Sequence, residues 1–276
     1  MYARFFTKAL ADMGLLGFQE PFANLFTQGM ITHEGAKMSK SKGNVISPST
    51  YVERYGADTA RCYILFLGPP AQDADWSDSG VGGVHRFLSR VWRLAETVRP
   101  LAGTPESFDP SGLEGGALEL ARKAHWAIDK VTGDIERFQF NTAIAALMEL
   151  VNEIYREMED DAAAPAVSFA AATAASLLFP FAPHLSAELW EALMGGRAWE
   201  VRWPRADVRL LQRDMLTMVV QVNGKVRDSI ELPVGTDGEA AEAAARQAPN
   251  VQRHLDGREV AKVVVVPGRL VNFVVR

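Results

Sequence analysis

The sequence predicts a multidomain, mainly α-helical protein: a short mixed α/β segment, then a helical bundle, then a small ββαββ domain of the α+β class. Three observations predict this. The chain of 276 residues exceeds the usual range of one domain. The apolar pattern mixes short elements up to about residue 78 and is helical from there to about residue 214. An Asn-Gly turn between two extended runs then begins a strand-rich region. We therefore predict domains at 1–78, 79–214 and 215–276.

In the first segment, apolar residues at helical spacing predict a helix over 3–13. A short strand is expected within 26–32, and Glu34-Gly35 is typical of a turn. Helices are then expected over 49–55 and 56–67. Alternating short elements of this kind are typical of α/β or mixed structure.

The middle segment has the apolar spacing of a helical bundle, with short connections between long amphipathic runs. Asn141 is placed as the N-cap of one helix. Trp92, Trp126 and Trp190 fall at helical spacings and are expected in the core, whereas Trp76 borders the bundle and is a candidate contact between domains. The helices expected are residues 85–98, 117–138, 141–158, 166–178 and 184–193.

The last segment predicts two hairpins around a helix. Asn223-Gly224 separates two extended runs, and both residues of such a turn need a positive φ. Thr236 followed by Glu239 matches a capping box, and the helix after it is expected to run to about Gln247 and stop at Pro249. The strands expected are residues 217–222, 225–232, 260–266 and 270–275.

Composition excludes several classes of protein. The single cysteine, Cys62, excludes a disulfide framework and multi-cysteine metal sites, so we expect no metal site, and its apolar helix places it in the core. We find no apolar run of the roughly 18–20 residues that span a bilayer, and no signal-peptide pattern at the start. We therefore expect a cytoplasmic protein without membrane association.

The net charge of −5 argues against a nucleic-acid-binding protein, but the charge is uneven. Residues 101–214 hold 10 Lys or Arg against 18 Asp or Glu, whereas both ends are near neutral. We interpret the acidic residues of the middle segment as the exposed faces of its helices. The net charge of the whole chain therefore does not indicate whether its two end segments bind nucleic acid.

The most informative stretch is Lys37–Asn44, which reads K-M-S-K-S-K-G-N. It places three cations and two hydroxyls in a loop expected between a strand and a helix. Such a loop can surround a polyphosphate, because lysine is a compact charge that follows a moving phosphate. Gly35 and Gly43 bracket the loop and permit it to move. Composition alone favours an ordinary solvated loop over a phosphate-binding one.

The order of residues in K-M-S-K-S resembles the signature loop of class I aminoacyl-tRNA synthetases. Flanking segments, among them Y-A-R-F-F at 2–6, Y-G-A-D-T-A-R at 55–61 and Q-V-N-G-K-V-R at 221–227, resemble the bacterial leucyl-tRNA synthetase family, and the resemblance covers nearly the whole chain. It implies the C-terminal end of a Rossmann-type catalytic domain, then an anticodon-binding-like bundle, then a tRNA-binding domain.

In that family the leucine carboxylate attacks the α-phosphate of ATP, which gives leucyl-adenylate and pyrophosphate, and leucine then passes to tRNA(Leu). The resemblance implies that Lys40 contacts ATP and stabilises the charge of the departing pyrophosphate. Lys37, Met38, Ser39 and Ser41 complete the catalytic, ATP-binding loop, and Mg²⁺ accompanies ATP.

The resemblance also implies contacts with tRNA. Arg86, Arg90 and Arg93 are three or four residues apart and share one helix face, with Arg99 near the end of that helix. An alternative, that these are solvated cations paired with nearby acids, is left open. Lys225 and Arg227 are the candidates at the first hairpin of the last domain.

The sequence departs from the family in one respect. The family's H-I-G-H signature is absent, because the five histidines form no H-x-G-H pattern. His184, at a helix start, is interpreted as a packing or capping residue, and His33 alone is weak evidence of a site. We therefore expect the C-terminal portion of a longer enzyme, monomeric, which meets leucine only through the remainder of the catalytic domain and does not activate leucine alone.

Two alternatives stay open. One is a non-catalytic tRNA-binding module. The other is a sister class I synthetase for isoleucine, valine or methionine, against which the ββαββ domain and the lack of zinc-type cysteines argue.

Overall fold

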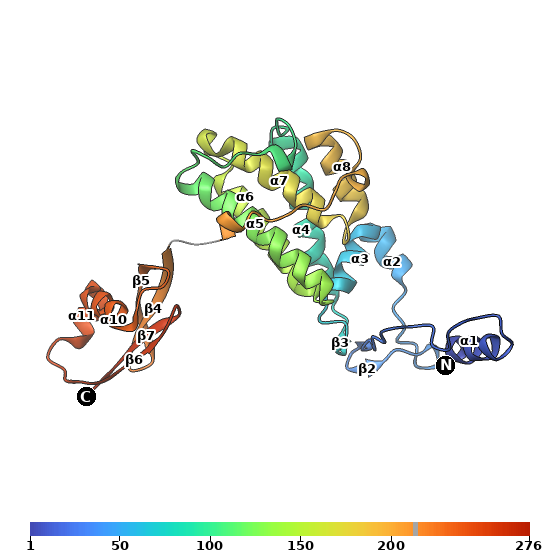
Figure 1. The fold of residues 1–276 in the computed structure, drawn as a ribbon, viewed down its shortest axis with the longest axis horizontal. Helices are drawn as coiled ribbons and strands as arrows, with labels where there is room; N and C mark the ends of the chain where they lie inside the picture. The colour runs from blue at the N-terminus through green and yellow to red at the C-terminus, as the bar shows by residue number, and fades with distance from the viewer. Residues whose placement is uncertain (212–214) are drawn as a thin grey trace. The chain divides into compact units, whose positions relative to one another are not determined.

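The computed structural model describes residues 1–211 and 215–276, which form two compact units, Met1–Ala206 and Asp207–Arg276. The described chain is mainly helical with two small sheets, one in each unit (Figure 1). The predicted end of the middle domain, residue 214, lies outside the described residues. The predicted division after residue 78 falls inside the first unit and stays a prediction.

The first unit begins with α1 (Tyr2–Asp12), which confirms the first predicted helix but buries only Thr7. A three-stranded sheet of order β2-β1-β3 follows, in which β1 (Ile31–His33) pairs antiparallel with β2 (Ala36–Lys37) and parallel with β3 (Ala74–Asp75). The turn at Glu34-Gly35 is confirmed, with φ values of 53° and 70°.

The strand expected within 26–32 is shorter than predicted and begins only at Ile31. Just before it, the Gly29 backbone N–H donates to the Pro70 carbonyl at 2.7 Å. A Cβ added at Gly29 would lie 2.1 Å from the carbonyl oxygen of Gln72. The chain therefore makes a close backbone approach at this point, which only glycine permits, and enters the sheet afterwards.

Seven helices longer than one turn follow within the first unit: the first two agree with the helices expected over 49–55 and 56–67, and the other five with those expected in the bundle. α7 packs against α5, α6 and α8, and most of its residues are buried (Figure 1). The helices are α2 (Pro48–Tyr55), α3 (Ala57–Phe66), α4 (Asp78–Thr97), α5 (Gly115–Glu136), α6 (Phe140–Glu157), α7 (Ala164–Leu178) and α8 (Pro183–Met194). Short 3₁₀ turns, η2 (Pro105–Ser107), η3 (Asp161–Ala163) and η4 (Ala198–Glu200), occupy the connections.

The helical stretch at α7 corrects one expectation from the sequence. The window Asp161–Leu178 is long and apolar enough to cross a membrane by length and composition, although we expected no such run. Within the bundle, 72% of this window is buried. That burial is typical of the core helix of a helical bundle.

The predicted N-cap at Asn141 is wrong. The helix begins at Phe140 with Gln139 at the N-cap, so Asn141 lies inside the first turn. The cause is the tight turn before it, where Phe138 has a φ of 57° and the Gln139 N–H donates to the Asp134 carbonyl at 2.7 Å. The conformation of this turn thus overrides the capping preference of asparagine.

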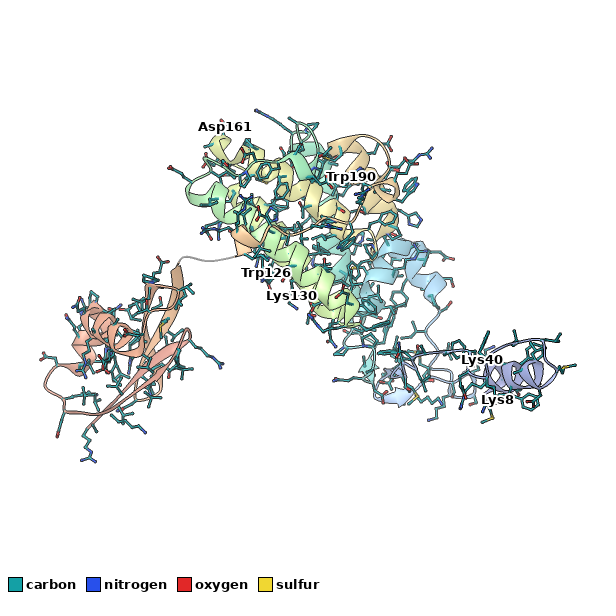
Figure 2. All side chains as sticks on the ribbon, in the orientation of Figure 1. Lys8, Lys40, Trp126, Lys130, Asp161 and Trp190 are labelled. Carbon is teal, nitrogen blue, oxygen red and sulfur yellow. The ribbon has the colours of Figure 1, made fainter. Side chains whose placement is uncertain are left out.

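The prediction that three tryptophans lie in the core is correct for one. Trp190 is buried and Trp126 is half-buried; both are labelled in Figure 2. The Lys123 Nζ lies 3.5 Å from the ring centre of Trp126. Trp92 is 43% exposed, although the next turn of α4 toward the N-terminus includes the buried Leu88.

The single cysteine lies in the core, as the sequence predicts. Cys62 is fully buried on α3, and burial, with a smaller contribution from Asp58, raises the pKa of its thiol to about 12. The thiol therefore stays protonated and packs as a small apolar group.

The second unit starts with the short helix α9 (Val208–Leu211) and holds a four-stranded sheet of order β5-β4-β7-β6. Its central strands run parallel and its two outer pairs antiparallel. Asn223 and Gly224 have φ values of 51° and 75°, which confirms the predicted hairpin. The Asn223 side chain also accepts from the Val275 N–H at 2.9 Å, which ties the turn to β7. The strands are β4 (Met215–Val222), β5 (Lys225–Pro233), β6 (Val260–Val266) and β7 (Leu270–Val275).

Two details of the ββαββ prediction need correction. The helix cap is Asp237, whose carboxylate accepts from the Ala240 N–H at 2.8 Å, whereas Thr236 donates to the Pro233 carbonyl. The expected single helix is two, α10 (Gly238–Gln247) and α11 (Pro249–Leu255), so the order is ββααββ. Pro249 ends the first helix as predicted but also starts the second, where its missing N–H costs nothing.

We predict that Asp134→Ala lowers the free energy of unfolding by about 1–3 kcal/mol, the cost of leaving buried partners without an acceptor. Asp134 is 2% exposed and accepts from Lys130, from Arg137 at 3.0 Å and from Thr142 at 2.6 Å. Urea denaturation measures the change. The exposed neighbour on the same helix, Asp129→Ala, is the control and should change stability by less than about 0.5 kcal/mol.

The same contact predicts a pH dependence. Burial raises the pKa of Asp134, but the hydrogen bonds from Lys130, Thr142 and Arg137 outweigh it, so the net shift is downward. A depressed pKa contributes stability above the unfolded value of about 4 and loses it as the pH falls toward the folded value. The stability gap between wild type and Asp134→Ala should therefore narrow below about pH 4. A constant gap down to pH 2 would contradict this reading.

Candidate functional site

The candidate site is built on the turn between β1 and β2. The Asp75 carboxylate of β3 accepts from the Thr32 hydroxyl at 2.7 Å and from the Gly35 N–H at 3.1 Å. These two hydrogen bonds, the Thr32 bond first, hold the pKa of Asp75 below its usual value. The hairpin that leads into the K-M-S-K-S loop is thus fixed to a strand about 40 residues later in the chain.

The loop itself is a single 3₁₀ turn, η1 (Lys40–Lys42). Ser39 caps the turn, because its Oγ accepts from the Lys42 N–H at 3.3 Å. The hydroxyls of Ser39 and Ser41 lie 3.2 Å apart. Gly43 ends the turn with a φ of 68°, a conformation that glycine adopts without strain.

Asn44 closes this loop onto its own start. Its Oδ1 accepts from the Ser39 N–H at 2.9 Å, and its Nδ2 donates to the Lys37 carbonyl at 3.3 Å. Both sides of the amide are therefore used within one loop. The fold of the loop does not depend on any of its lysine side chains.

The cations of the loop are available to a ligand. Lys37, Lys40 and Lys42 are exposed, and within residues 1–211 and 215–276 none of them forms an ion pair. Figure 2 labels Lys40 on the lobe that carries α1. Unpaired ammonium groups on a fixed backbone turn can neutralise the negative charge of a polyphosphate without first breaking an internal contact.

An apolar cavity of about 650 Å³ lies beside Lys37 and Met38. Phe26 enters its wall and stacks on Phe138, with ring centres 4.9 Å apart. Since Phe138 lies in the turn between α5 and α6, this stack joins the loop-bearing segment to the helical bundle.

Trp76, which the sequence makes a candidate contact between domains, packs on α2 and α3 just before α4 begins, so its ring partners fall within the predicted first domain and that role stays a prediction. The indole N–H donates to Asp78 at 2.9 Å, and the ring packs edge-on against Tyr51 and Tyr63 with centres 4.8 and 4.9 Å away. The Ser77 N–H donates to the Tyr63 hydroxyl at 2.8 Å. Hydrogen bonds from Tyr51 and then Trp76 hold the pKa of Asp78 below its usual value.

The start of α8 is capped from another helix. The Asp58 carboxylate, on α3, accepts from the Leu185 N–H at 2.7 Å and lies 2.8 Å from the His184 Nδ1. The capping group is therefore Asp58, and the packing or capping role that the sequence predicts for His184 is wrong, because the His184 side chain is 70% exposed and only contacts the capping carboxylate.

The three arginines proposed for tRNA on α4 differ in their surroundings. Arg86 and Arg93 are exposed. Arg90 is half-buried, donates to Asn152 at 2.7 Å and lies over the Tyr155 ring. Arg90 is thus engaged with α6, which weakens its case as an RNA contact.

The two cations proposed at the β4–β5 hairpin also differ. Lys225 is exposed at the start of β5. Arg227 is half-buried, and its Nε is buried with no hydrogen-bond partner. All these assignments to tRNA remain predictions.

Sequence reasoning missed two residues that shape the site. Asn44 follows the signature directly, and the Gly-Asn pair after three lysines was a signal for a closed turn. Asp58 gave no such signal, because its partners lie some 126 residues away. Across the described ranges, no group of three His, Cys, Asp or Glu side chains gathers as a metal site would require.

Two family models match the chain. Residues 3–77 match the class I tRNA synthetases for isoleucine, leucine, methionine and valine. Residues 118–243 match the anticodon-binding domain of tRNA ligases.

Curated relatives extend the match to the whole chain. The leucine–tRNA ligase of Nitratidesulfovibrio vulgaris strain DSM 19637 / Miyazaki F is 48% identical over 286 residues, and that of Geobacter sp. strain M21 is 47% identical over 279 residues. Each alignment covers 100% of this chain and 34% of the relative. The chain therefore spans about one third of the length of these relatives, and the resemblance noted in the sequence is confirmed.

Solved structures agree. The LeuRS (agnB2) of Agrobacterium radiobacter K84, crystallised as a ternary complex with tRNA and LeuAMS, is 36% identical with a TM-score of 0.73, covering 100% of this chain and 36% of that one. A Mycobacterium tuberculosis methionyl-tRNA synthetase is 18% identical with a TM-score of 0.50, over 66% of this chain and 40% of that one. At that identity it shows a related fold alone.

We predict that Asn44→Ala accelerates trypsin cleavage after Lys37, Lys40 and Lys42 several-fold, since the loop loses both hydrogen bonds that close it. Asn44→Asp keeps the oxygen that accepts from Ser39 and loses the donor to Lys37, so its cleavage rate should be intermediate. Mass spectrometry of early digestion products measures these rates.

A matched control is Ser47→Ala, which removes a hydroxyl whose hydrogen bond, to Ser49, lies outside the loop. It should leave the cleavage rate unchanged. Equal rates for wild type and Asn44→Ala would mean that Asn44 does not hold the loop.

Proposed function

We propose that this chain, a member of the leucyl-tRNA synthetase family, contributes the ATP-contacting loop and the tRNA-binding surfaces of a leucine–tRNA ligase. It matches the portion of such ligases that covers the end of the catalytic region and the anticodon-binding domain. Whole-enzyme leucine activation and transfer to tRNA(Leu) are the activity to which we assign it.

The main support for this proposal is the structure of the K-M-S-K-S loop. Its backbone is closed by Ser39 and Asn44, whereas its lysines are exposed and free of ion pairs in the described chain. A loop of solvated residues without a role does not need a cap at each end of one 3₁₀ turn. Free cations on a fixed turn are what transfer of a nucleotidyl group requires.

The chemistry follows from that arrangement. When the leucine carboxylate attacks the α-phosphate, negative charge accumulates on the departing pyrophosphate. Lys40 on η1 is the residue that we assign to this charge, with Lys37 beside it and the Ser39 and Ser41 hydroxyls as hydrogen-bond donors. Because the turn is already closed, the cations need little reorganisation when the charge develops.

ATP enters as a substrate and not as a resident cofactor. The donor set of the loop, ammonium and hydroxyl groups, fits phosphate oxygens and does not fit a metal ion, which prefers carboxylate ligands. We therefore assign Mg²⁺ to the ATP itself, outside this chain's own ligands. Leucine is bound by the remainder of the enzyme.

For tRNA(Leu) we assign two surfaces. The exposed Arg86 and Arg93 on α4 are candidates for phosphate contacts in the first unit, and Lys225 and Arg227 in the second. The family enzymes are cytoplasmic, and we infer the same location and a monomeric state for this one.

The alternative of a synthetase for another amino acid has less support. The relatives that align with the whole chain at 47–48% identity are leucine–tRNA ligases, whereas the methionine enzyme is similar at 18%. We expect the isolated 276 residues to behave as the other alternative, a tRNA-binding module. The reason is that their five histidines include no H-x-G-H pattern.

To test the role of Lys40, we would replace the matching third of the Nitratidesulfovibrio ligase by this chain and measure leucine-dependent ATP–pyrophosphate exchange. In that chimaera, Lys40→Ala should lower the exchange rate by about 10²–10³-fold, the usual cost of removing one transition-state charge partner.

The control is Lys8→Ala, because Lys8 is an exposed lysine on α1 that pairs with Glu20. Its exchange rate should stay within about twofold of the unsubstituted chimaera. The isolated 276-residue chain should give no exchange. Unchanged exchange in Lys40→Ala, or exchange by the isolated chain, would contradict the assignment.

Binding of tRNA is tested on the chain alone. Filter binding of a tRNA(Leu) transcript should weaken linearly on a log–log plot as salt rises, because phosphate contacts release counterions. Lys225→Ala should reduce the magnitude of that slope by about one. Lys262→Ala, on β6, is the comparison. An unchanged slope in Lys225→Ala would remove that residue from the interface.

A further inference from the structure

A cavity of about 510 Å³ opens on the first unit where α3, α4 and α8 meet. It is separate from the loop and lies within the size range of ligand sites. Its wall combines aromatic and cationic side chains: Tyr55, His85, Trp92, Arg93 and His184, with Asp58.

Trp92 is the least expected member of this wall. It is 43% exposed on a bundle helix, although the neighbouring apolar residues of α4, among them Val91 and Leu94, are almost completely buried. A single exposed apolar side chain is ordinary, so what points to a ligand is the position of this indole in the wall of a cavity that also holds Arg93. An exposed indole beside a cation is the combination that stacks on a nucleobase.

The charge of the wall favours an anion. Arg93 is exposed and has no ion pair within the described ranges. The acid of the cavity, Asp58, is compensated by the Leu185 N–H and by contact with His184. His85 packs against Tyr55 with ring centres 5.4 Å apart and lies 3.5 Å from the Thr59 hydroxyl, so its position is fixed.

We propose that this cavity binds one unpaired nucleotide of RNA, with the base stacked on Trp92 and a flanking phosphate on Arg93. The inference rests on the proposed function in one respect, since tRNA(Leu) is the RNA that we assign to the chain. It adds a site that reads an unstacked base, where phosphate contacts alone would fix only the position of the RNA.

The arrangement explains why two neighbours on one helix differ in role. Arg90 turns to Asn152 and Tyr155 and stabilises the bundle, whereas Arg93 lies at the cavity. A nucleotide bound there would contact α4 directly. It would also lie against the starts of α3 and α8, which line the other walls.

The test measures equilibrium binding of a tRNA(Leu) transcript to the full 276-residue chain at fixed salt. Trp92→Ala should weaken binding by about 5- to 150-fold, the range for losing one base–aromatic stack, with the salt slope unchanged. Trp92→Phe keeps a ring and should recover most of the affinity. Arg93→Ala should instead reduce the salt slope by about one.

Trp199→Ala is the matched control, since Trp199 is 58% exposed and also lies beside an arginine, Arg197, but lines a different part of the surface. It should bind like wild type. Circular dichroism and thermal unfolding check that each variant folds, and if Trp92→Ala does not fold, Trp92→Phe and Arg93→Ala decide the question.

The outcomes separate the two proposals. Binding by wild type that Trp92→Ala and Arg93→Ala leave unchanged overturns the nucleotide site alone. No binding by wild type overturns both the site and the assignment of tRNA. If Trp92→Ala changes the sedimentation coefficient of the chain without RNA, a second copy covers the cavity and the nucleotide site is overturned.

Discussion

The short parallel pairing of β1 with β3 is the contact on which the rest of the first unit depends. It places residues 31–32 beside residues 74–75. The five residues from Ala74 to Asp78 then contact both the hairpin that leads into the loop and the helices of the bundle. Asp75 holds the hairpin turn, Trp76 packs against Tyr51 and Tyr63, and Asp78 begins α4. The signature loop is therefore joined to the helical bundle through one continuous segment.

The loop and the bundle use charge in opposite ways. In the bundle, several acidic residues pair with nearby cations, as Lys123 pairs with Glu149 and Arg137 with Asp134, although the acids of the middle segment outnumber its cations by 18 to 10. In the loop, the backbone is closed by Ser39 and Asn44, and the lysines stay unpaired across the described residues. A net charge of −5 is therefore compatible with contacts to anionic ligands, because the acids and the available cations lie in different places.

Local chemistry made much of this fold predictable. The Asn223-Gly224 and Glu34-Gly35 turns, the helices of the bundle and the four strands of the last domain follow from turn residues and apolar spacing, which act over a few residues. Three features were missed: the capping of α8 by Asp58, which depends on partners some 126 residues away, the turn at Phe138 that displaced the helix start from Asn141, and the exposure of Trp92. For the candidate site, the order of residues identified the loop, but no spacing rule indicated that Asn44 closes it, since that depends on the three-dimensional path of the turn.

The central claim is that this chain provides a working third of a leucine–tRNA ligase. Charging of tRNA(Leu) with labelled leucine by the chimaera, in which this chain replaces the matching third of the Nitratidesulfovibrio enzyme, tests it most directly. We expect the chimaera to form leucyl-tRNA(Leu) well above the level of the same ligase lacking that third. A folded chimaera that binds tRNA(Leu) but forms no leucyl-tRNA would contradict it.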